Sequence, residues 1–554
     1  MSYDAIIIGS GAGGAASAYQ LSRLGLKILL LESGPVYDPV KDYLLHTNGW
    51  ELTTFPDKNV RKPWYNFGKM QILDKRHETL RSWNHIHGLQ NQTMRRLAVR
   101  YSHIQGLGGS TLHFTGEAHR LNPASMKLKT DFAVGADWPV SYEELEKYYV
   151  QAERIVGVAG AANDKVRTRS QPYPLPPHPL SYASQKIAAA CKKLGLNWVQ
   201  NSLAVLSQAY DGRPECNYCN QCNRGCPRRD KGSVDVTFLA KVDPQRCTIK
   251  TGCHVLYLTP GKNDRIDGVH YVDETGKSIY AQATWYIVAC GAIATPRLLL
   301  NSKNAYAPDG LANESGQVGR NFLESVSWTS CAIAKEPVGT QRGLPADGIC
   351  WDFNGPQSIP GLVGGCRFSL AASEANLTGP INYANRVVSG WGIQHKQLLR
   401  QTFGRVVAIG GIAEQLPNPA SFVALDNVQV DEFGMPKATI YSHLAEMDID
   451  RLKFMAGKTR DILQAMDVET VFEEYGVYDR FNAAHVFGTC RMGESAQDSV
   501  VDRYCCSHRW RNLSIVDGSV FPSSGGGEAP SLTIEALALY ACENIHRRIV
   551  QKEA

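Results

Sequence analysis

The amino-terminal segment constrains the fold of this chain more than any other stretch. An apolar run at residues 5–8 ends in the turn Gly9-Ser10-Gly11-Ala12-Gly13-Gly14, and an alanine-rich helical stretch follows it. A second apolar run, Ile28–Leu31, then ends at Glu32. This order predicts a strand, a glycine turn, a helix and a second strand, which together form the first unit of a Rossmann-like parallel sheet.

The glycines and the acidic residue of this unit predict a bound dinucleotide. Gly9 permits the tight turn, Gly11 permits the backbone to approach a pyrophosphate, and Gly14 permits close packing of helix and strand. The helix start offers free N–H groups and the positive end of its dipole to the phosphates. Glu32 can accept a hydrogen bond from a ribose 2′-hydroxyl and would repel a phosphate there, which favours FAD or NAD. The alternative is a glycine-rich turn that binds no ligand.

Length and composition exclude several classes of protein. A chain of 554 residues exceeds one ordinary core, so two or more domains are expected, and 43% apolar with 20% charged residues is typical of a globular protein. A net charge of +5 gives no signal for nucleic acid or a membrane surface, and the longest uncharged run, Ser278–Pro296, is too polar for a membrane span. No cationic leader precedes the first strand, which predicts a cytoplasmic protein; periplasmic export with a signal-bearing partner subunit is the alternative.

Segments spread over almost the whole chain resemble, in the same order, those of the glucose–methanol–choline (GMC) oxidoreductases, FAD enzymes that oxidise alcohols and sugars. Besides GSGAGG with Glu32, they are GLGGST at 106–111, DWPVSYEELEKYY at 137–149, CGAIATPRLLLNS at 290–302, VGRNF at 318–322, HVFGTCRMG at 485–493, LSIVDGSVFP at 513–522 and APSLTIEALAL at 529–539. A run of cysteines and DEFGMP at 431–436 look like the branch that contains gluconate, sorbitol and fructose dehydrogenase flavoprotein subunits.

The predicted architecture is an α/β Rossmann-like FAD-binding domain with a second, α+β substrate domain built on an antiparallel sheet. Alternating, turn-punctuated segments from about residue 325 to 441 predict that sheet, and the amphipathic stretch Asp448–Met466 predicts a helix. The expected division is 1–130 FAD-binding (first part), 131–204 lid and linker helices, 205–324 FAD-binding (second part), 325–470 substrate domain and 471–554 FAD-binding (C-terminal part).

His485 matches the active-site histidine of the GMC family. Removal of a hydride from a carbinol carbon requires a base for the hydroxyl proton, and a neutral imidazole is suited to this near pH 7. The alternative is a histidine that caps the GTCRMG turn. The family usually has a second His or Asn just before a proline, whereas this chain has Ala529 before Pro530. Either His485 works alone, or Glu528 or a residue of the substrate domain assists it.

The resemblance also implies a set of FAD contacts. Gly109 and Ser110 would lie by the flavin and pyrophosphate, and Val255 would meet the adenine through its backbone. Further contacts are implied for Asp517 and Gly518 at the ribitol–phosphate region, and for the backbone amides of Leu532 and Thr533 at the pyrimidine carbonyl of the flavin. His113 matches the position at which a family relative carries its flavin covalently; the alternative is a packed histidine at the dimethylbenzene edge.

The cysteine run has the spacing Cys216-x₂-Cys219-x₂-Cys222-x₃-Cys226-Pro227, which is known from bacterial iron–sulfur ligation. Because only one such run exists here, it predicts at most one cluster, of the [3Fe–4S] type, and the resemblance to the dehydrogenase branch implies that this cluster would take electrons from flavin. Oxidases of the same superfamily have a similar cysteine run that is followed by a lysine motif, here Asp230-Lys231-Gly232-Ser233. The alternative is therefore that the cysteines are packed as small apolar residues. Zinc is less favoured because the four cysteines are crowded.

The combined prediction is an FAD-dependent dehydrogenase that oxidises a CH–OH group of a sugar, polyol or related alcohol by hydride transfer to flavin. Its expected partners are a small-molecule substrate and either a small subunit or a cytochrome-type electron acceptor. One alternative is an oxidase that uses O₂ and produces H₂O₂. An alternative of another class is a lyase on the same fold, as hydroxynitrile lyases resemble this family.

Overall fold

The computed structural model describes residues 3–45, 47–52, 63–162 and 164–551, and its first domain contains a five-stranded parallel sheet. The order of the strands is β23-β12-β1-β2-β8, with bounds Leu513–Ile515, Ala283–Val288, Tyr3–Ile8, Ile28–Leu31 and Cys247–Lys250. Helix α1, Ala12–Arg23, connects β1 to β2. The predicted strand–turn–helix–strand unit and the Rossmann-like fold class are therefore confirmed.

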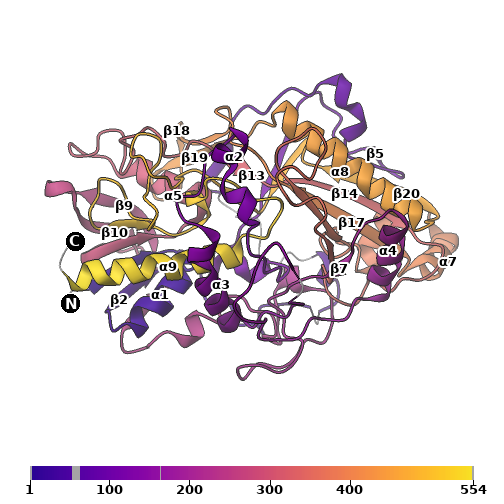
Figure 1. Ribbon diagram of the computed structural model, residues 1–554, viewed down its shortest axis with the longest axis horizontal. Helices are drawn as coiled ribbons and strands as arrows, with labels where there is room; N and C mark the ends of the chain where they lie inside the picture. The colour runs from indigo at the N-terminus through magenta and orange to yellow at the C-terminus, as the bar shows by residue number, and fades with distance from the viewer. Residues whose placement is uncertain (1–2, 46, 53–62, 163, 552–554) are drawn as a thin grey trace.

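Helices cover one side of this sheet and a small antiparallel sheet completes the domain. Helix α9 (Ser531–Val550) contacts both α1 and α3 (Tyr142–Val156), and Figure 1 shows α1 and α9 side by side near both termini. Strands β9 (His254–Pro260), β10 (Ile266–Val272) and β11 (Ser278–Ala281) form the small sheet, and β10 contacts β12. Apolar side chains of all these elements share one core, because each buries one face against the parallel sheet.

Local sequence signals set the ends of several helices. Ser141 caps α3 and Glu144 bonds back to the Ser141 N–H, so the capping box expected from the sequence is present. At the N-terminus of α4 (Tyr182–Lys193), the Ser181 side chain accepts a hydrogen bond from the Ser184 N–H. Helix α5, Gly291–Asn301, starts directly after β12 and Cys290. The remaining helices are α2 (Leu128–Phe132), α6 (Pro380–Arg386), α7 (Gly392–Thr402) and α8 (Glu446–Ala465).

The second domain is built on an eight-stranded antiparallel sheet, which confirms the predicted α+β architecture. Helix α8 packs against β14 and β17 on one face of this sheet. The sheet lies at the other end of the molecule from the termini (Figure 1). Its order is β5-β4-β20-β14-β17-β16-β15-β7, with bounds Gly88–Leu89, Trp83–Asn84, Thr470–Gly476, Val326–Ile333, Val406–Ala413, Cys366–Leu370, Gly348–Cys350 and Val199–Gln200.

Segments far apart in the chain contribute to the edges of this sheet. Strands β4 and β5 come from the predicted first FAD-binding segment, β7 comes from the predicted linker, and β20 begins at residue 470. Two-residue strands such as β7 carry no readable alternation, so the sequence pattern gives no signal for them. Three smaller sheets pair β18 (Phe422–Val430) and β19 (Pro436–Tyr441) with β3 (Tyr65–Phe67), β13 (Leu323–Glu324) with β22 (Val486–Phe487), and β21 (Arg480–Ala483) with β6 (Leu97–Tyr101). Within the described ranges, no helix combines the length and apolar character needed to cross a bilayer.

Candidate active site

A cavity of about 840 Å³ lies between the two domains and gathers most of the predicted site residues. Its size and its mixture of apolar walls with a few polar groups are typical of a cofactor or ligand site. The predicted residues that line it are Gly9, Gly11, Glu32, Gly109, Ser110, His113, Val255, His485, Asp517 and Gly518. Gly14, Leu532, Thr533 and the four cysteines of the run lie outside this lining.

The glycine turn at the start of α1 leaves one wall of the cavity clear. Gly9 has φ +94°, and a Cβ there would lie 2.4 Å from the Ala289 carbonyl oxygen, so both turn and packing require glycine. A Cβ on Gly14 would lie 1.9 Å from the Gly9 carbonyl oxygen. Gly11 differs, because a Cβ there would meet no atom within 4 Å and would project into open space. The backbone at Gly11 is thus free for close approach by a phosphate group, as the sequence predicts.

Glu32 follows β2 directly and lines the cavity beside the glycine turn. Its carboxylate accepts hydrogen bonds from the Ser10 N–H (3.0 Å), the Ser10 hydroxyl (2.6 Å) and the Gly34 N–H (2.8 Å). Burial raises the pKa of the carboxyl, and these hydrogen bonds oppose that shift. The turn and the acid are therefore held together as one unit.

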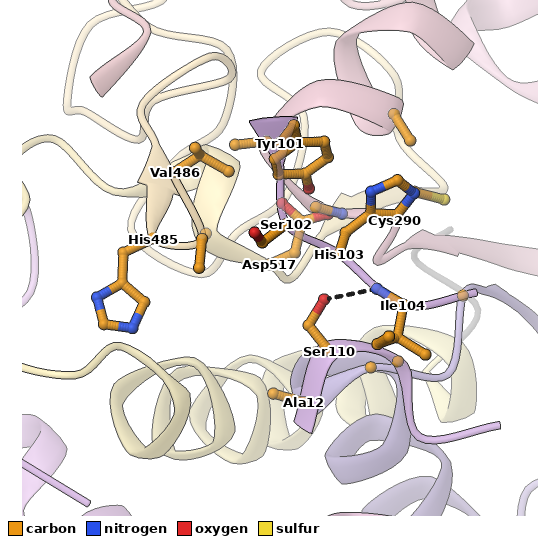
Figure 2. A pocket seen from close by; sticks show the side chains of 18 of the residues that line it. Ala12, Tyr101, Ser102, His103, Ile104, Ser110, Cys290, His485, Val486 and Asp517 are labelled. Atoms are coloured by element: carbon orange, nitrogen blue, oxygen red, sulfur yellow. Dashed lines mark hydrogen bonds between the residues drawn. The ribbon is translucent and has the colours of Figure 1, made fainter. Parts of the chain in front are cut away.

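The second glycine cluster packs against the first. A Cβ on Gly109 would lie 2.9 Å from the Gly11 Cα, which brings the start of the 3₁₀ turn Gly109–His113 against the glycine turn. The Ser110 hydroxyl accepts a hydrogen bond from the Ile104 N–H at 3.3 Å (Figure 2). His113, at the end of the turn, is buried in the cavity wall. Its position is compatible with both alternatives, a covalent flavin bond and a packed histidine.

Asp517 joins the C-terminal motif to helix α5. Its carboxylate accepts hydrogen bonds from the Gly291 N–H (2.9 Å), the Thr295 hydroxyl (2.6 Å) and the Ser519 N–H (2.8 Å). Helix α9 also starts at the cavity, since Pro530 and Ser531 line it. Leu532 and Thr533 have buried side chains outside the lining, and Pro530 at the N-cap offers no side-chain hydrogen bond to the first-turn amides.

His103 is a cavity residue that the sequence reasoning missed. Its ring stacks on Tyr101 at 4.6 Å between centroids and contacts the edge of Trp64 at 5.4 Å. In the described part of the chain, neither ring nitrogen makes a hydrogen bond of ordinary geometry, and burial lowers the pKa of the imidazole to about 4. Buried polar groups are as a rule hydrogen-bonded, so orphaned nitrogens at this wall fit a polar ligand such as a dinucleotide.

Together, these observations show that the residues of the cavity are suited to hold FAD. The clear wall at Gly11, the carboxylate of Glu32, the open amide end of α9 and the orphaned nitrogens of His103 all border one cavity. A dinucleotide requires this combination of phosphate, ribose and ring contacts.

His485 lies at a distance from that cofactor wall. It precedes β22, and its carbonyl oxygen accepts a hydrogen bond from the Ser325 N–H at 3.1 Å. Figure 2 shows its ring well separated from Tyr101, His103 and Cys290. Burial lowers the pKa of the imidazole to about 4, although Glu117 opposes this shift. His485 is therefore neutral near pH 7 and able to accept a proton.

The eight-stranded sheet contributes a hydroxyl-bearing wall to the same cavity. Ser327 and Thr329 of β14 and Ser325 directly before it line the cavity, whereas Val326 and Trp328 face the apolar core with α8. Ser369 of β16 and Tyr475 of β20 extend this wall. The alternation in the sequence was the available signal, but it does not show which face meets a ligand.

Glu528, suggested by the sequence as an assistant to His485, serves another purpose. Its side chain is buried outside the cavity lining. One carboxylate oxygen accepts hydrogen bonds from the Asn122 N–H (3.1 Å), Arg167 (2.7 Å) and Asn354 (2.9 Å). Glu528 thus cross-links three segments beneath the loop that leads to Ala529.

The cysteine run does not have the arrangement of a preformed metal site. Among the described residues, no group of three or more His, Cys, Asp or Glu side chains is placed to hold a metal ion. Cys216 and Cys222 pack in a small apolar cluster, and Cys226 donates to Asp230 at 3.1 Å. Burial raises the pKa of the Cys226 thiol to about 11, as for a thiol packed away from water. The alternative of packed cysteines fits these contacts better than an iron–sulfur cluster.

Lys231, in the motif that follows the run, explains why this loop is packed so tightly. Its buried ammonium donates to the carbonyl oxygens of Leu112 (2.9 Å), Phe114 (3.1 Å) and Cys222 (2.8 Å). These three bonds use all of its donors. The cysteine loop is thereby fixed to the segment that carries His113.

Comparison with known proteins agrees with the fold and the site. Residues 77–326 and 417–538 match the GMC oxidoreductase family, and residues 7–37 match the NAD(P)-binding Rossmann-like domain family. The chain is 27% identical to 2-methyl-1,2-propanediol dehydrogenase of Mycolicibacterium austroafricanum, over 98% of this chain and 95% of that protein. It is also 27% identical to the fructose dehydrogenase large subunit of Gluconobacter japonicus, over 98% of each chain.

A solved structure shows the same fold. The chain superposes on pyridoxine 4-oxidase from Mesorbium loti with a TM-score of 0.66 and 16% identity, over 99% of each chain. The two family matches lie in both domains and include the segments that carry His485, Gly109 and Asp517. This chain therefore belongs to the GMC oxidoreductase family and is an FAD-dependent oxidoreductase that acts on CH–OH groups.

Proposed function

We propose that this chain is a dehydrogenase for a sugar or polyol rather than an oxidase for a simple apolar alcohol. The observation that supports the polyhydroxylated substrate is the hydroxyl-bearing wall of Ser327, Thr329, Ser369 and Tyr475 in the same cavity as His485. Each hydroxyl can both donate and accept, which suits a substrate that carries several hydroxyl groups. The wider similarity to dehydrogenases of 2-methyl-1,2-propanediol and fructose supports the same substrate class.

The residues of this chain divide the work between two parts of the cavity. The glycine turn, Glu32, Gly109, Ser110, Val255 and the segment at Asp517 would hold FAD, and bound FAD supplies the hydride acceptor. His485, neutral near pH 7, takes the proton of the substrate hydroxyl. The β14 wall orients the substrate, and the amides of Leu532 and Thr533 at the start of α9 would favour negative charge beside them.

The electron acceptor is proposed to be a protein, either a small subunit or a cytochrome-type partner. This proposal is supported by the similarity to the fructose dehydrogenase large subunit, because a large subunit implies a further, smaller one. A [3Fe–4S] cluster at the cysteine run is not part of the proposal, because the contacts of Cys216, Cys222 and Cys226 are those of packed thiols. Iron and sulfide analysis of anaerobically purified protein tests that exclusion, and about three irons per flavin would reverse it.

The test is a panel of polyols and sugars matched with simple alcohols, assayed in parallel by reduction of an artificial dye and by peroxide formation. The proposal predicts turnover with at least one polyol or sugar, faster with dye than with O₂. Peroxide formed at the rate of dye reduction would establish the oxidase instead. Failure of every substrate to bleach the flavin anaerobically would favour the lyase. Acid precipitation of the same preparation shows whether flavin stays bound to the polypeptide, which decides between the two alternatives for His113.

A further inference from the structure

The position before Pro530 lacks the side chain that the proton-transfer chemistry would use. Ala529 lines the cavity, but its methyl group carries no donor or acceptor. Its N–H donates to Nδ1 of His119 at 3.0 Å, so Nδ1 must be unprotonated. The proton of His119 therefore sits on Nε2, which lies 2.9 Å from the Asn201 side-chain oxygen. Burial lowers the pKa of His119 to about 4, in agreement with a neutral ring.

This chain of hydrogen bonds ends at a carboxylate in the cavity. The Asn201 amide donates to the Ala346 carbonyl oxygen (2.9 Å) and to Oε1 of Glu117 (3.0 Å). The other oxygen of Glu117 accepts from Arg367, which is held in turn by the Gly527 carbonyl oxygen at 3.0 Å. Burial is the largest single influence and raises the pKa of Glu117, but Arg367, His119, His485 and the Asn201 hydrogen bond together outweigh it, so the pKa is lowered. Glu117 is consequently ionised and fixed in orientation.

Glu117 acts electrostatically on His485. Both residues line the same cavity, and the charged groups that influence the His485 ring are Glu117, which favours its protonated form, and Arg367, which disfavours it. When His485 accepts a proton, a fixed negative charge nearby stabilises the imidazolium without any reorganisation. The same buried network supports the backbone of Ala529, so the two sides of the site are mechanically connected.

We propose that Glu117, held by Asn201 and Arg367, is the positioning residue for His485 and takes over the role of the group that Ala529 lacks. This proposal rests on the proposed function of the cavity. As the alcohol is oxidised, His485 accepts the hydroxyl proton, and bound FAD would supply the two-electron acceptor for the hydride of the carbinol carbon. Glu117 keeps its charge throughout and stabilises the imidazolium. The product carbonyl leaves, and the proton of His485 returns to solvent.

The experiment compares Glu117→Gln with the wild-type holoenzyme in anaerobic flavin reduction by a polyol. The maximal rate should fall by about ten- to a hundredfold, which corresponds to one to two pKa units of lost imidazolium stabilisation. The substrate concentration at half-maximal rate should change by less than about threefold, because Glu117 acts on the transition state. The solvent deuterium isotope effect on the rate should increase, since proton transfer becomes slower. A merely structural residue would not change the isotope effect.

Two further variants complete the design. Glu146→Gln removes a carboxylate that pairs with Arg120 outside the cavity lining, so its rate and isotope effect should match the wild type. Glu117→Asp keeps the charge, and should show intermediate values while retaining flavin even if Glu117→Gln fails to fold. Wild-type rate and isotope effect in Glu117→Gln, or in Glu117→Asp if only that variant folds, would overturn the proposal. Absence of wild-type flavin reduction would instead reject the proposed function.

Discussion

The cofactor part and the substrate part of the cavity are built from the chain in different ways. The cofactor part is largely local: the glycine turn and Glu32 come from one strand–helix–strand unit, and Ser10 bonds directly to Glu32. The substrate part is assembled from distant segments, with Thr329, Ser369 and Tyr475 on three different strands of one sheet. A local unit can be recognised as a motif, whereas the wall exists only after the sheet has formed. A mutation in the cofactor part should therefore change FAD binding without changing substrate oxidation, and a mutation in the substrate part should do the reverse.

Two buried histidines express the same contrast. His103 and His485 both have a pKa lowered to about 4 by burial, so both are neutral near pH 7. The His103 ring stacks on Tyr101 and contacts Trp64. Its two ring nitrogens have no hydrogen-bond partner of ordinary geometry among the described residues and could bond to a ligand. His485 instead lies near an ionised carboxylate, Glu117, that stabilises its protonated form. Equal pKa values thus occur in two different surroundings, and the proposed function assigns ligand contact to one and proton transfer to the other.

The largest expected effect separates the two parts most clearly. His485→Ala removes the base from the substrate part, so turnover should fall by about two to four orders of magnitude. Flavin content should stay at the wild-type level, because His485 lies apart from the cofactor wall. Steady-state kinetics and the flavin absorbance of the purified variant measure both quantities. Near-normal turnover would remove His485 from the mechanism.

A smaller effect is expected from the converse change. Glu32→Ala removes the ribose contact, worth roughly 1.5–3 kcal/mol for a hydrogen bond to a charged group, so FAD affinity should weaken by about ten- to a hundredfold. Turnover at saturating FAD should remain close to the wild type. Titration of apoprotein with FAD, followed by flavin fluorescence, gives the dissociation constant. An unchanged constant would mean that Glu32 does not meet the ribose.

The hydroxyl wall predicts a still smaller, substrate-dependent change. Thr329→Val replaces a hydroxyl by a methyl group of the same shape and should raise KM for a polyol by about two- to tenfold, the worth of one neutral hydrogen bond. Thr329→Ser keeps the hydroxyl and should behave like the wild type. KM for a simple mono-alcohol should not respond to either change. Equal effects on both substrates would argue that Thr329 only supports the sheet.

The smallest effect concerns pH. The proposed function makes neutral His485 the base, and its pKa is lowered to about 4, so kcat/KM should show no acid loss between about pH 8 and about pH 5. With a histidine base of ordinary pKa, the enzyme would lose activity below about pH 6.5.

The stability of the fold should also depend on pH. His103, His119 and His485 all take up protons on unfolding, so stability should decline as pH falls from about 6.5 towards 4. Activity retained after incubation at each pH separates unfolding from titration of the base.

The comparison also explains what could be predicted from the sequence. The strand–turn–helix–strand unit, the capping box at Ser141 and the α8 helix follow from local patterns, and the structure confirms them. Glu117 and His103 carry no local signature, because their roles depend on Arg367 and Tyr101 being brought next to them by folding. The cysteine spacing shows the converse: a strong local signature does not ensure that Cys216, Cys222 and Cys226 adopt the geometry of ligands.

The central claim is that one cavity binds FAD and oxidises a CH–OH group of a polyhydroxylated substrate. Its most direct test is an anaerobic titration of the purified holoenzyme with polyols and sugars, with the flavin absorption spectrum recorded after each addition. The account predicts complete bleaching of the oxidised flavin bands by at least one polyol or sugar, with recovery on addition of an electron-accepting dye. A preparation that binds FAD, but whose flavin is bleached by none of these substrates, would contradict it.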